Sequence, residues 1–463
     1  MIPPEAYTII SSLFPRLLGM IYFFAFFPFI FQIKGLVGEK GILPAQQYLE
    51  VFRKRMGKRR YFLLPTLFWL NCSDRALVIV PVIGSVLSVL LMLGVCPPLL
   101  LAVLILLHLS IVTIGQDFLG FGWEGFFLEL SYHALLMSLT VVPNIFVWLS
   151  VNVLIFRMHL QAGTCKLMSG DPSWKNLTAL CVHYQTQPIP STLAWYAHKL
   201  PVWFQKLSVA AMLAAEIVLP FLVFGIEQMR LIAFAGFFGL QFFIWVSGNY
   251  SYLNYLTSVA VSLLISNTYL SGYISAPDPA SHSWVISSFI SLGGIGLLAV
   301  QLLALWYHFF RTPWLNRLFR NLFPYHLGNR FGIFAVMTTE RYEVVLEGSM
   351  DGEQWEEFLF WFKPSEPERR PRRIAPFQPR LDWQAWFLPF TTFENSRWFQ
   401  QFVVRILEDS PEVRKLVRFH PFPGHPPKFL RAKLYLYEFT PWGAKNWWKR
   451  KEIGEYMDIK YIN

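Results

Sequence analysis

The stretch NIFVWLSVNVLIFRM, residues 144–158, runs without a break into HLQAGTCKLMSGDPSWKNLTALCVHYQTQPIP, residues 159–190. The first part is apolar, as a helix that crosses the hydrocarbon core of a bilayer must be over about 17–25 residues. The second part holds two lysines, an aspartate, two cysteines, a tryptophan and two histidines among polar amides. This change predicts a membrane helix followed by a polar loop, residues 161–204, at the membrane edge.

The composition places most of the chain in a membrane. Of 463 residues, 54% are hydrophobic and 15% are charged, whereas about 25% of residues are charged in an average soluble domain. Apolar runs predict eight or nine spans, of which 122–142 and 145–160 are the weakest because they carry ionisable residues or are short. The candidate spans lie near 9–31, 76–94, 97–115, 122–142, 145–160, 205–226, 230–247, 250–268 and 284–308.

Beyond about residue 310 charged residues become frequent, which indicates a separate extramembrane domain, 311–463, after a transmembrane helical domain, 1–310. Within it, residues 342–362 read as a β-hairpin around Ser-Met-Asp-Gly, and residues 432–439 alternate as a strand does. Residues 396–407 show helical spacing. The predicted fold is a polytopic α-helical membrane protein with a C-terminal β-rich domain, α+β and similar to a β-sandwich.

The net charge of +11 does not indicate nucleic-acid binding. One basic run, RKRMGKRR at 53–60, precedes the second span, and much of the remaining Lys and Arg is interspersed with acids beyond 310. Basic residues beside spans usually mark the cytoplasmic side. With 53–60 in the cytoplasm the N-terminus lies outside, and eight spans would then place the C-terminal domain outside as well. We expect membrane lipid, and no nucleic acid, as a partner.

Ionisable residues within apolar segments form a predicted intramembrane polar cluster, because each costs about 2.5–3.5 kcal/mol at a helix centre unless it faces protein or water. Its members are either a structural network that holds helices together or a buried site for protons or a ligand. Antiparallel packing of neighbouring spans makes Glu124 the expected partner of Arg157, while Glu129 and His133 share a helix face. The cluster comprises Asp117, Glu124, Glu129, His133 and Arg157, with Lys166 adjoining it.

The four cysteines are too few for a disulfide framework. Cys165 and Cys181 share the polar loop, and they are either a disulfide or two unpaired thiols. The sequence contains no Gly-rich phosphate loop, no zinc-spaced cysteine pair and no serine elbow. We therefore expect neither a metal nor a cofactor.

Several motifs that follow one another between residues 35 and 457 resemble the lipase maturation factor family. They cover nearly the whole chain. They are GLVGEKGILPA at 35–45, the 159–190 stretch, VSGNYSYLNYLT at 246–257, RFGIFAVMTTERYEVVLEGSMDGEQWEEF at 330–358, FQPRLDWQAWF at 377–387, PFPGHPPKFLRAKLYLYEF at 421–439 and WWKRKEIGEYM at 447–457. The resemblance implies a membrane protein whose C-terminal domain lies outside the cytoplasm and which helps secreted lipases reach their folded, dimeric state. It implies the endoplasmic reticulum membrane in a eukaryote; the compact chain suggests a bacterial inner membrane.

The loop AGTCKLMSGDPSWKNL also resembles, more distantly, a short segment of vitamin-K-dependent gamma-glutamyl carboxylase, which implies Lys166 as a candidate catalytic base. Structural anchoring of Lys166, and an N-cap role for Asp171, are the alternatives. We predict a maturation factor that binds a secreted client, for which the resemblance implies a lipase, and that is not an enzyme; a membrane enzyme with Lys166 as base is the alternative. Candidate contacts for a client or ligand are Asp171, Trp174, His183, Tyr184, Gln185, Arg380, Asp382 and Trp383.

Overall fold

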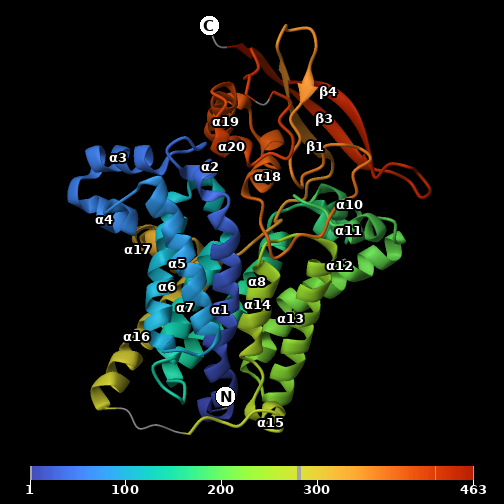
Figure 1. Ribbon diagram of the computed structural model, residues 1–463. Coiled ribbons are helices and arrows are strands. Elements are labelled where there is room, and N and C mark those ends of the chain that lie inside the picture. Colours follow the sequence, from blue (N-terminus) through green and yellow to red (C-terminus); the bar gives the residue numbers. More distant parts are fainter. Residues whose placement is uncertain (1–2, 279–282, 423, 462–463) are drawn as a thin grey trace.

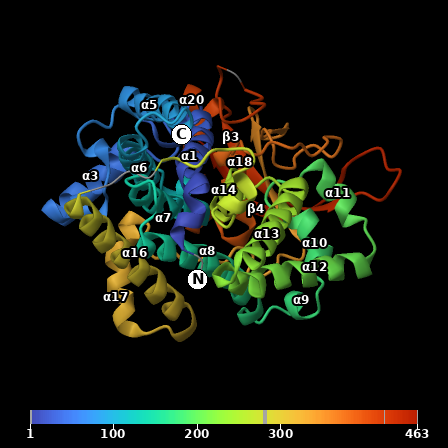
Figure 2. The same ribbon diagram turned by 90° about the horizontal axis from the view of Figure 1, so that it is seen from below.

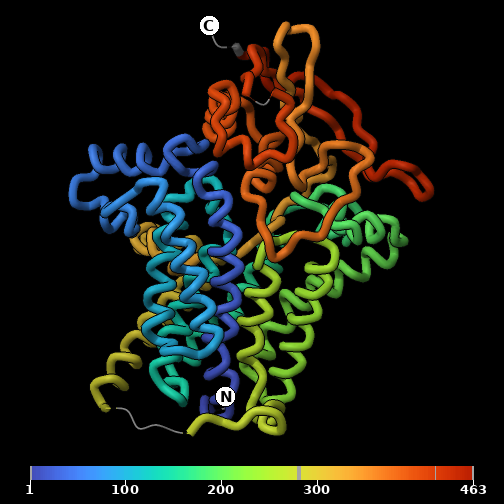
Figure 3. The backbone as a smooth tube through the Cα atoms, viewed as in Figure 1, coloured from blue at the N-terminus to red at the C-terminus, as the bar shows by residue number. Residues whose placement is uncertain are grey.

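The computed structural model describes residues 3–278, 283–422 and 424–461. It consists of a bundle of helices and a domain built around a β-sheet, which stands on one end of the bundle (Figure 1). The N-terminus lies at the far end of the bundle, and the C-terminus lies in the sheet domain (Figure 3). The path from the N-terminus to the sheet domain therefore crosses the whole length of the bundle.

Seven helical segments in the described residues are long and apolar enough to cross a membrane, which makes the chain an integral membrane protein. The first of these segments consists of η1 (Pro4–Tyr7), a 3₁₀ helix, and α1. The segment that begins with α12 extends through the 3₁₀ helix η5 (Leu219–Phe224). The seven helices are α1 (Thr8–Ile30), α5 (Asp74–Met92), α6 (Pro97–Ile114), α8 (Ile145–Met168), α12 (Val202–Ile217), α13 (Glu227–Ser247) and α16 (Trp284–Phe310).

Two further helices lie within the bundle. α7 (Gly122–Met137) has 16 residues and α14 (Leu253–Ser262) has 10, so each is shorter than the apolar run that contains it. Most side chains of α7 are buried, including two glutamates and a histidine. A helix with ionisable groups inside a membrane must be surrounded by protein, and this is where α7 lies.

Short helices cap the two ends of the bundle and cover its rim. They are α2 (Ile33–Val37), α3 (Ala45–Met56), η2 (Gly57–Arg59), α4 (Arg60–Leu63), η3 (Leu67–Trp69), η4 (Gln116–Leu119), α9 (Pro172–Lys175), α10 (Ala179–Thr186), α11 (Thr192–His198), α15 (Asn267–Leu270), α17 (Pro313–Leu322) and η6 (Phe323–Tyr325). The polar loop expected at 161–204 is thus largely helical, and α8 continues through Met168.

The sheet domain contains one antiparallel sheet of four strands in the described residues, in the order β2-β1-β3-β4. The expected hairpin is confirmed, since β1 pairs with β2, and the expected strand and helix are β3 and α19. The elements are β1 (Arg341–Ser349), β2 (Glu356–Glu357), α18 (Arg380–Ala385), η7 (Leu388–Phe390), η8 (Phe393–Asn395), α19 (Arg397–Leu407), α20 (Pro411–Arg414), β3 (Phe429–Phe439) and β4 (Trp448–Tyr461).

Helices rather than a second sheet cover this sheet. One face carries Leu346 and Ala432, which pack in the same apolar cluster as Phe402 of α19. The other face carries Tyr437 and Trp448, which pack with the rim helix α11. Because side chains alternate between the two faces of a strand, the sheet domain is a layered α/β unit that uses the bundle as one of its layers.

The basic run at 53–60 and the sheet domain lie at the same end of the bundle, since α3 and α4 follow the top of α1 (Figure 1). α2 at that end packs against α20 of the sheet domain, where a methyl group on Gly35 would lie 2.5 Å from the carbonyl oxygen of Glu412. The expectation that the basic run lies in the cytoplasm and the expectation that the C-terminal domain lies outside cannot both hold, because both segments lie at one end of the bundle. The start of α1 lies at the opposite end, whereas eight spans would place the N-terminus on the same side as the C-terminal domain.

Candidate functional site

The junction between the bundle and the sheet domain gathers most of the polar side chains that the motifs contain. Arg341, at the start of β1, is almost fully buried and directs its guanidinium toward the segment that follows α10. Its Nη1 donates to the carbonyl oxygens of Gln185 (3.0 Å) and Gln187, and its Nη2 donates to that of Pro188 (2.9 Å). One side chain thus fixes a bundle segment against the first strand of the sheet.

The charge of Arg341 is balanced by Glu343, two residues along the same face of β1. Arg341 Nη2 lies 2.5 Å from Glu343 Oε1, and Lys363 Nζ lies 2.7 Å from Glu343 Oε2. All three side chains are buried. Removing one partner of a buried ion pair leaves an uncompensated charge and typically costs about 3–5 kcal/mol, so this triad holds the junction in one geometry.

Asp382 supports the same region from α18. Its carboxylate accepts the backbone N–H groups of Phe362 (2.5 Å) and Lys363 (2.9 Å). Burial nevertheless raises the pKa of Asp382 to about 6, because desolvation of the carboxylate outweighs these hydrogen bonds. Asp382 holds these backbone groups, whereas Arg380, two residues before it, forms its ion pair with Glu124.

The SGNY motif forms a second attachment. Asn249 Nδ2 donates to the carbonyl oxygens of Ile189 (3.1 Å) and Arg372 (2.8 Å), and its Oδ1 accepts from the N–H of Ile374 (2.8 Å). Tyr250 OH donates to Gln187 Oε1 (2.9 Å). One asparagine and one tyrosine therefore connect the end of α13 both to the rim segment and to residues of the C-terminal domain.

The predicted contact residues of α10 are used within the chain. His183 lies 3.0 Å from Tyr250 OH, and Gln185 Oε1 accepts from the N–H of Phe439 (2.7 Å). Tyr184 packs against the apolar cluster that covers the sheet. Burial lowers the pKa of His183 to about 4, so this imidazole is neutral near pH 7.

Arg380 extends from α18 into the bundle, where it meets Glu124 of α7. Its Nη1 lies 2.7 Å from Glu124 Oε1 and donates to the carbonyl oxygen of Phe118 at 3.1 Å. The second oxygen of Glu124 accepts from Tyr252 OH and lies 3.2 Å from His108 Nε2. The sheet domain thus supplies the cation for a carboxylate that has no exposed surface.

Arg157 pairs with Glu129 and not, as expected, with Glu124. Arg157 Nη2 lies 2.8 Å from Glu129 Oε1, and Arg157 Nη1 donates to the carbonyl oxygen of Asn329. Gln301 Nε2 and Asn329 Nδ2 also donate to the carboxylate of Glu129, each at 2.8 Å. Asn329 follows α17, so a residue beyond 310 also enters the bundle and donates hydrogen bonds to a buried carboxylate there.

The remaining members of the predicted cluster lie apart. His133 contacts the carbonyl oxygen of Glu129 and Ser150 Oγ, both at 2.8 Å, rather than the carboxylate of Glu129. Asp117 lies in η4, in the turn between α6 and α7, with its side chain exposed. The expectation of a single cluster is therefore wrong, because Glu124 and Glu129 each have their own set of partners.

Lys166 forms a third pair, with Glu216 of α12. Its Nζ lies 2.7 and 2.6 Å from the two carboxylate oxygens and 5.5 Å from the centre of the Trp174 ring. Asp171 does not reach Lys166: it accepts the N–H groups of Ser173 (2.8 Å) and Met337 (2.6 Å), the first of which is the expected N-cap bond. Lys166 thus donates to both carboxylate oxygens of Glu216, and this arrangement corresponds to the anchoring interpretation.

Both loop cysteines are free thiols, and Cys165 Sγ donates to the carbonyl oxygen of Ala162 at 3.2 Å. Trp174 Nε1 donates to the carbonyl oxygen of Ala335 (3.1 Å). Trp383 of α18 is buried against the start of α7, and its ring centre lies 5.2 Å from that of Trp123. Every predicted contact residue is therefore engaged by the chain itself in this conformation.

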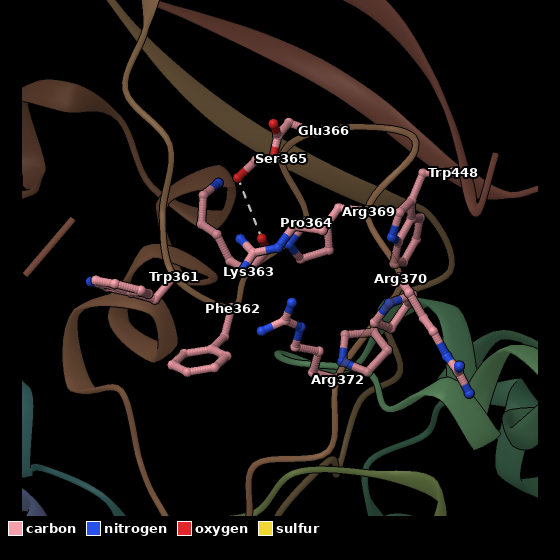
Figure 4. A pocket seen from close by; sticks show the side chains of 12 residues that line it. Trp361, Phe362, Lys363, Pro364, Ser365, Glu366, Arg369, Arg370, Arg372 and Trp448 are labelled. Atoms are coloured by element: carbon pink, nitrogen blue, oxygen red, sulfur yellow. Dashed lines mark hydrogen bonds between the residues drawn. The ribbon is translucent and has the colours of Figure 1, made fainter. Parts of the chain in front are cut away.

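A shallow cleft opens beside the Arg341 triad, and Lys363 of the triad is one of the residues that line it (Figure 4). Trp448 of β4 lines one side and Trp361 the other, and Arg372 lies between them. Arg370 points away from the centre of the cleft, and its guanidinium lies 5.5 Å from the centre of the Trp447 ring. The cleft thus leads from the junction to a surface of aromatic and cationic side chains.

This surface, here called the aromatic patch, consists of Trp195, Tyr196, Trp442 and Trp447. The ring centre of Trp442 lies 5.0 Å from that of Trp195 and 5.7 Å from that of Tyr196. Trp442 is 64% exposed and Tyr196 is 41% exposed. Two of the four rings come from α11 of the bundle and two from the β3–β4 connection, so the patch exists only while the junction holds these segments together.

The comparisons with known proteins cover both parts of the chain. A model of the lipase maturation factor transmembrane domain matches residues 9–271, and a model of the lipase maturation factor C-terminal domain matches residues 327–458. The chain belongs to the lipase maturation factor family. Within this family, it is 31% identical to lipase maturation factor 2 of Gallus gallus, over 96% of this chain and 80% of the relative.

The lipase maturation factor 1 proteins of Bos taurus and Homo sapiens are each 30% identical, over 96% of this chain and 87% and 86% of the relatives. No solved structure matches. The boundary between the two matched domains, 271–327, contains α16 and α17. The junction of this family member therefore joins both matched domains through side chains of each.

Sequence reasoning missed Arg341, Lys363 and Asn249, although each lies within or close to a motif. Alternation along RYEVV puts Arg341 and Glu343 on one face of a strand. This pairing of an arginine with a glutamate on one strand face was the signal that the sequence offered. Asn249 gave no such signal, because an asparagine in a short polar segment is as typical of an exposed turn.

Proposed function

We propose that this protein is a membrane-bound maturation factor that assists the folding or assembly of secreted client proteins by binding them, with no chemistry of its own. Membership in the lipase maturation factor family supports this role and makes a lipase the first client to test. The C-terminal domain then faces the side of the membrane where secreted proteins fold. The site of action is an endoplasmic reticulum membrane in a eukaryote and an inner membrane in a bacterium.

The observation that carries the proposal is the aromatic patch. Trp, Tyr and Arg are enriched at the centres of protein interfaces, where a few of them supply most of the binding free energy. Lys199 lies 4.9 Å from the centre of the Trp195 ring, and Arg370 lies against Trp447, so cations flank the four rings. A client segment with apolar and acidic side chains fits this composition.

The patch also has a suitable position. It stands beside the start of α12, whose exposed Trp203 and Phe204 are typical of side chains at a membrane–water interface. The patch therefore lies close to the membrane surface on the side of the sheet domain. A client emerging through or along that membrane would meet it before it reached the outer end of the sheet.

The ion pairs described above favour binding over catalysis. Lys166, the candidate base, is 3% exposed and holds both oxygens of Glu216. A general base must be within hydrogen-bond reach of its substrate. Lys166 instead donates to both carboxylate oxygens of Glu216 and so stabilises the contact of α8 with α12.

The test is a double variant, Tyr196→Ala with Trp442→Ala, in cells that lack their own maturation factor and express a secreted dimeric lipase. Loss of interface aromatics typically costs about 2 kcal/mol or more, which is about 30-fold in affinity. We expect the amount of lipase captured on the tagged membrane protein, and the secreted lipase activity, to fall by at least about tenfold. The variant should keep the thermal stability of the wild type.

A matched control replaces one tyrosine and one tryptophan at the opposite end of the bundle, Tyr273→Ala with Trp284→Ala. These side chains are 90% and 79% exposed, but they face the other side of the membrane from the patch. Lipase capture should be unchanged in this control. Undiminished capture by a folded patch variant would refute the patch as the client-binding surface.

A further inference from the structure

The segment between α1 and α5 carries a dense group of cations, at residues 53–60, that form no ion pair within the described residues. Six of the eight residues in RKRMGKRR are basic, and the side chains of residues 53–59 are all exposed. Across residues 3–278, 283–422 and 424–461, no ion pair within 4.0 Å includes any of these six cations. The positive charge of α3, η2 and α4 is therefore free to act on something outside the chain.

Large apolar side chains are interleaved with these cations. Phe62 is 71% exposed, Tyr61 49% and Met56 40%, and Leu70 just beyond α4 is 86% exposed. Arg60 stacks on Tyr61, with 4.4 Å from its guanidinium carbon to the ring centre. Exposed apolar side chains among unpaired cations are typical of helices that lie in the interface of a membrane.

Hydrogen bonds fix the depth of this segment in the bilayer. Thr66 Oγ1 donates to the carbonyl oxygen of Ser110 (3.2 Å), and the N–H of Leu67 donates to Ser110 Oγ (3.0 Å). Ser110 lies four residues before the end of α6 at Ile114, which is about 6 Å along the helix axis. Residues 62–70 therefore lie level with the last turn of a membrane-spanning helix, where lipid headgroups begin.

A second basic amphipathic helix occurs on the same flank. α17 follows the end of α16 and exposes Trp314 (61%), while Phe323 just after it is 71% exposed. Arg317 and Arg320 are exposed on α17, and residues 311–339 contain no acidic residue. Figure 1 and the view from below in Figure 2 both place α3 and α17 on the same side of the bundle.

We propose that these two segments, residues 45–63 and 311–323, form a basic shelf that binds anionic lipid headgroups in the leaflet on the side of the sheet domain. Each Lys or Arg near an anionic membrane surface contributes about 1 kcal/mol. The shelf carries nine cations and one acid: Arg53, Lys54, Arg55, Lys58, Arg59, Arg60, Arg311, Arg317 and Arg320, with Glu50.

The depth of the shelf selects lipid over other anionic partners. A nucleic acid or an acidic protein would approach from the aqueous side, and it would leave Phe62 and Leu70 without an apolar partner. A lipid offers a phosphate to the cations and an acyl chain to the apolar side chains at the same depth. The shelf thereby fixes the tilt and depth of the bundle, and hence the height of the sheet domain above the membrane.

The test uses the purified full-length protein in detergent micelles that contain equal amounts of phosphatidylglycerol and phosphatidylcholine. Native mass spectrometry counts the lipids that each protein retains. We expect retained phosphatidylglycerol to exceed phosphatidylcholine and the excess to shrink at least about threefold in the shelf variant. The shelf variant is Arg53→Gln, Lys54→Gln, Arg55→Gln, Lys58→Gln and Arg59→Gln.

A control variant removes the same number of exposed cations from the sheet domain: Lys428→Gln, Lys445→Gln, Lys449→Gln, Lys451→Gln and Lys460→Gln. The excess of phosphatidylglycerol should persist in this control. An excess that is unchanged in the shelf variant, or that falls equally in both variants, overturns the proposal, because it would then reflect net charge rather than a surface.

A second measurement does not depend on charge. Replacing Phe62 by the photoreactive p-benzoylphenylalanine in native membranes should give, after illumination, an adduct with the mass of a phospholipid. The same replacement of Met350, which is 41% exposed in the turn between β1 and β2, serves as the control and should give no lipid adduct. A protein adduct in place of the lipid at position 62 would show that the shelf docks an acidic protein, and it would likewise overturn the proposal.

Discussion

The ion pair between Arg380 and Glu124 should control how firmly the sheet domain is attached to the bundle. Glu124 has no exposed surface and Arg380 is 3% exposed. Arg380→Met removes the cation while keeping much of the side-chain volume. It also leaves the carbonyl oxygen of Phe118 without the donor that now lies 3.1 Å away.

The expected magnitude follows from what Glu124 retains. Removing one partner of a buried ion pair costs about 3–5 kcal/mol. Tyr252 OH still donates to the carboxylate, and His108 Nε2 still lies 3.2 Å away, so we expect the lower end, about 3 kcal/mol. Glu124→Gln removes the charge that Arg380→Met strands, and the double variant should recover about 2 kcal/mol of the summed losses.

The assay is a double-mutant cycle on thermal unfolding in detergent, with proteolysis of the 364–378 segment as a second measure of detachment. A companion cycle combines Arg157→Met with Glu124→Gln, whose effects should add within about 0.5 kcal/mol because Arg157 pairs with Glu129. Strict additivity of Arg380→Met and Glu124→Gln would refute the reasoning. So would a coupling between Arg157 and Glu124 as large as that expected for Arg380.

Two further predictions concern acid dependence and topology. Burial raises the pKa of Asp382 to about 6, so the folded state binds a proton more tightly than the unfolded state. The stability contribution of protonated Asp382 is then complete below about pH 4 and is lost as the pH rises to about 6. The free energy of unfolding should fall by about 3 kcal/mol over this range. Unfolding curves between pH 4 and 7 should show this fall, and Asp382→Asn should abolish it. The topology can be measured with reporters that are active on only one side of the membrane. A reporter inserted after Gly57 and one fused to the C-terminus should give the same result, and one fused before the N-terminus should give the opposite result. Different results from the first two would contradict the arrangement of the bundle.

Regular patterns in the sequence were sufficient for the individual elements. Hydropathy located the long helices, since a 20-residue apolar run has few other structures open to it. Alternation and the Ser-Met-Asp-Gly turn located β1, β2 and β3, and helical spacing located α19. These signals are local, because each depends on the residues of one element alone.

The partner of Arg157 was predicted wrongly because only the distance from the turn was considered. The expected pairing set the C-terminal part of α8 against the N-terminal part of α7, which contains Glu124. Helical side chains, however, lean toward the N-terminus of their own helix. Arg157 on α8 leans toward the turn and Glu129 on α7 leans away from it, so these two meet although their backbone positions differ by about one helical turn.

The partner of Glu124 could not be found by any local argument. Arg380 lies 256 residues away, in the other matched domain. Its motif, RLDW, gives the same local pattern whether it is an exposed corner or a buried contact. The same holds for His183 and Gln185, whose polar, Pro-punctuated surroundings predicted an exposed loop, whereas the sheet domain covers them.

The location of these partners imposes an order on biosynthesis. A ribosome that has just completed α8 has placed Glu124 and Glu129 in the membrane, while Asn329 and Arg380 follow Glu129 and Glu124 by 200 and 256 residues. Until those later residues have been made, Glu124 lacks its arginine and Glu129 lacks the asparagine amide, so the nascent bundle remains loosely packed. The membrane part thus becomes fully packed only after the downstream domain has been synthesised and has docked. A chain that ends early by premature termination keeps an unpaired intramembrane charge, by which cellular quality control can recognise it.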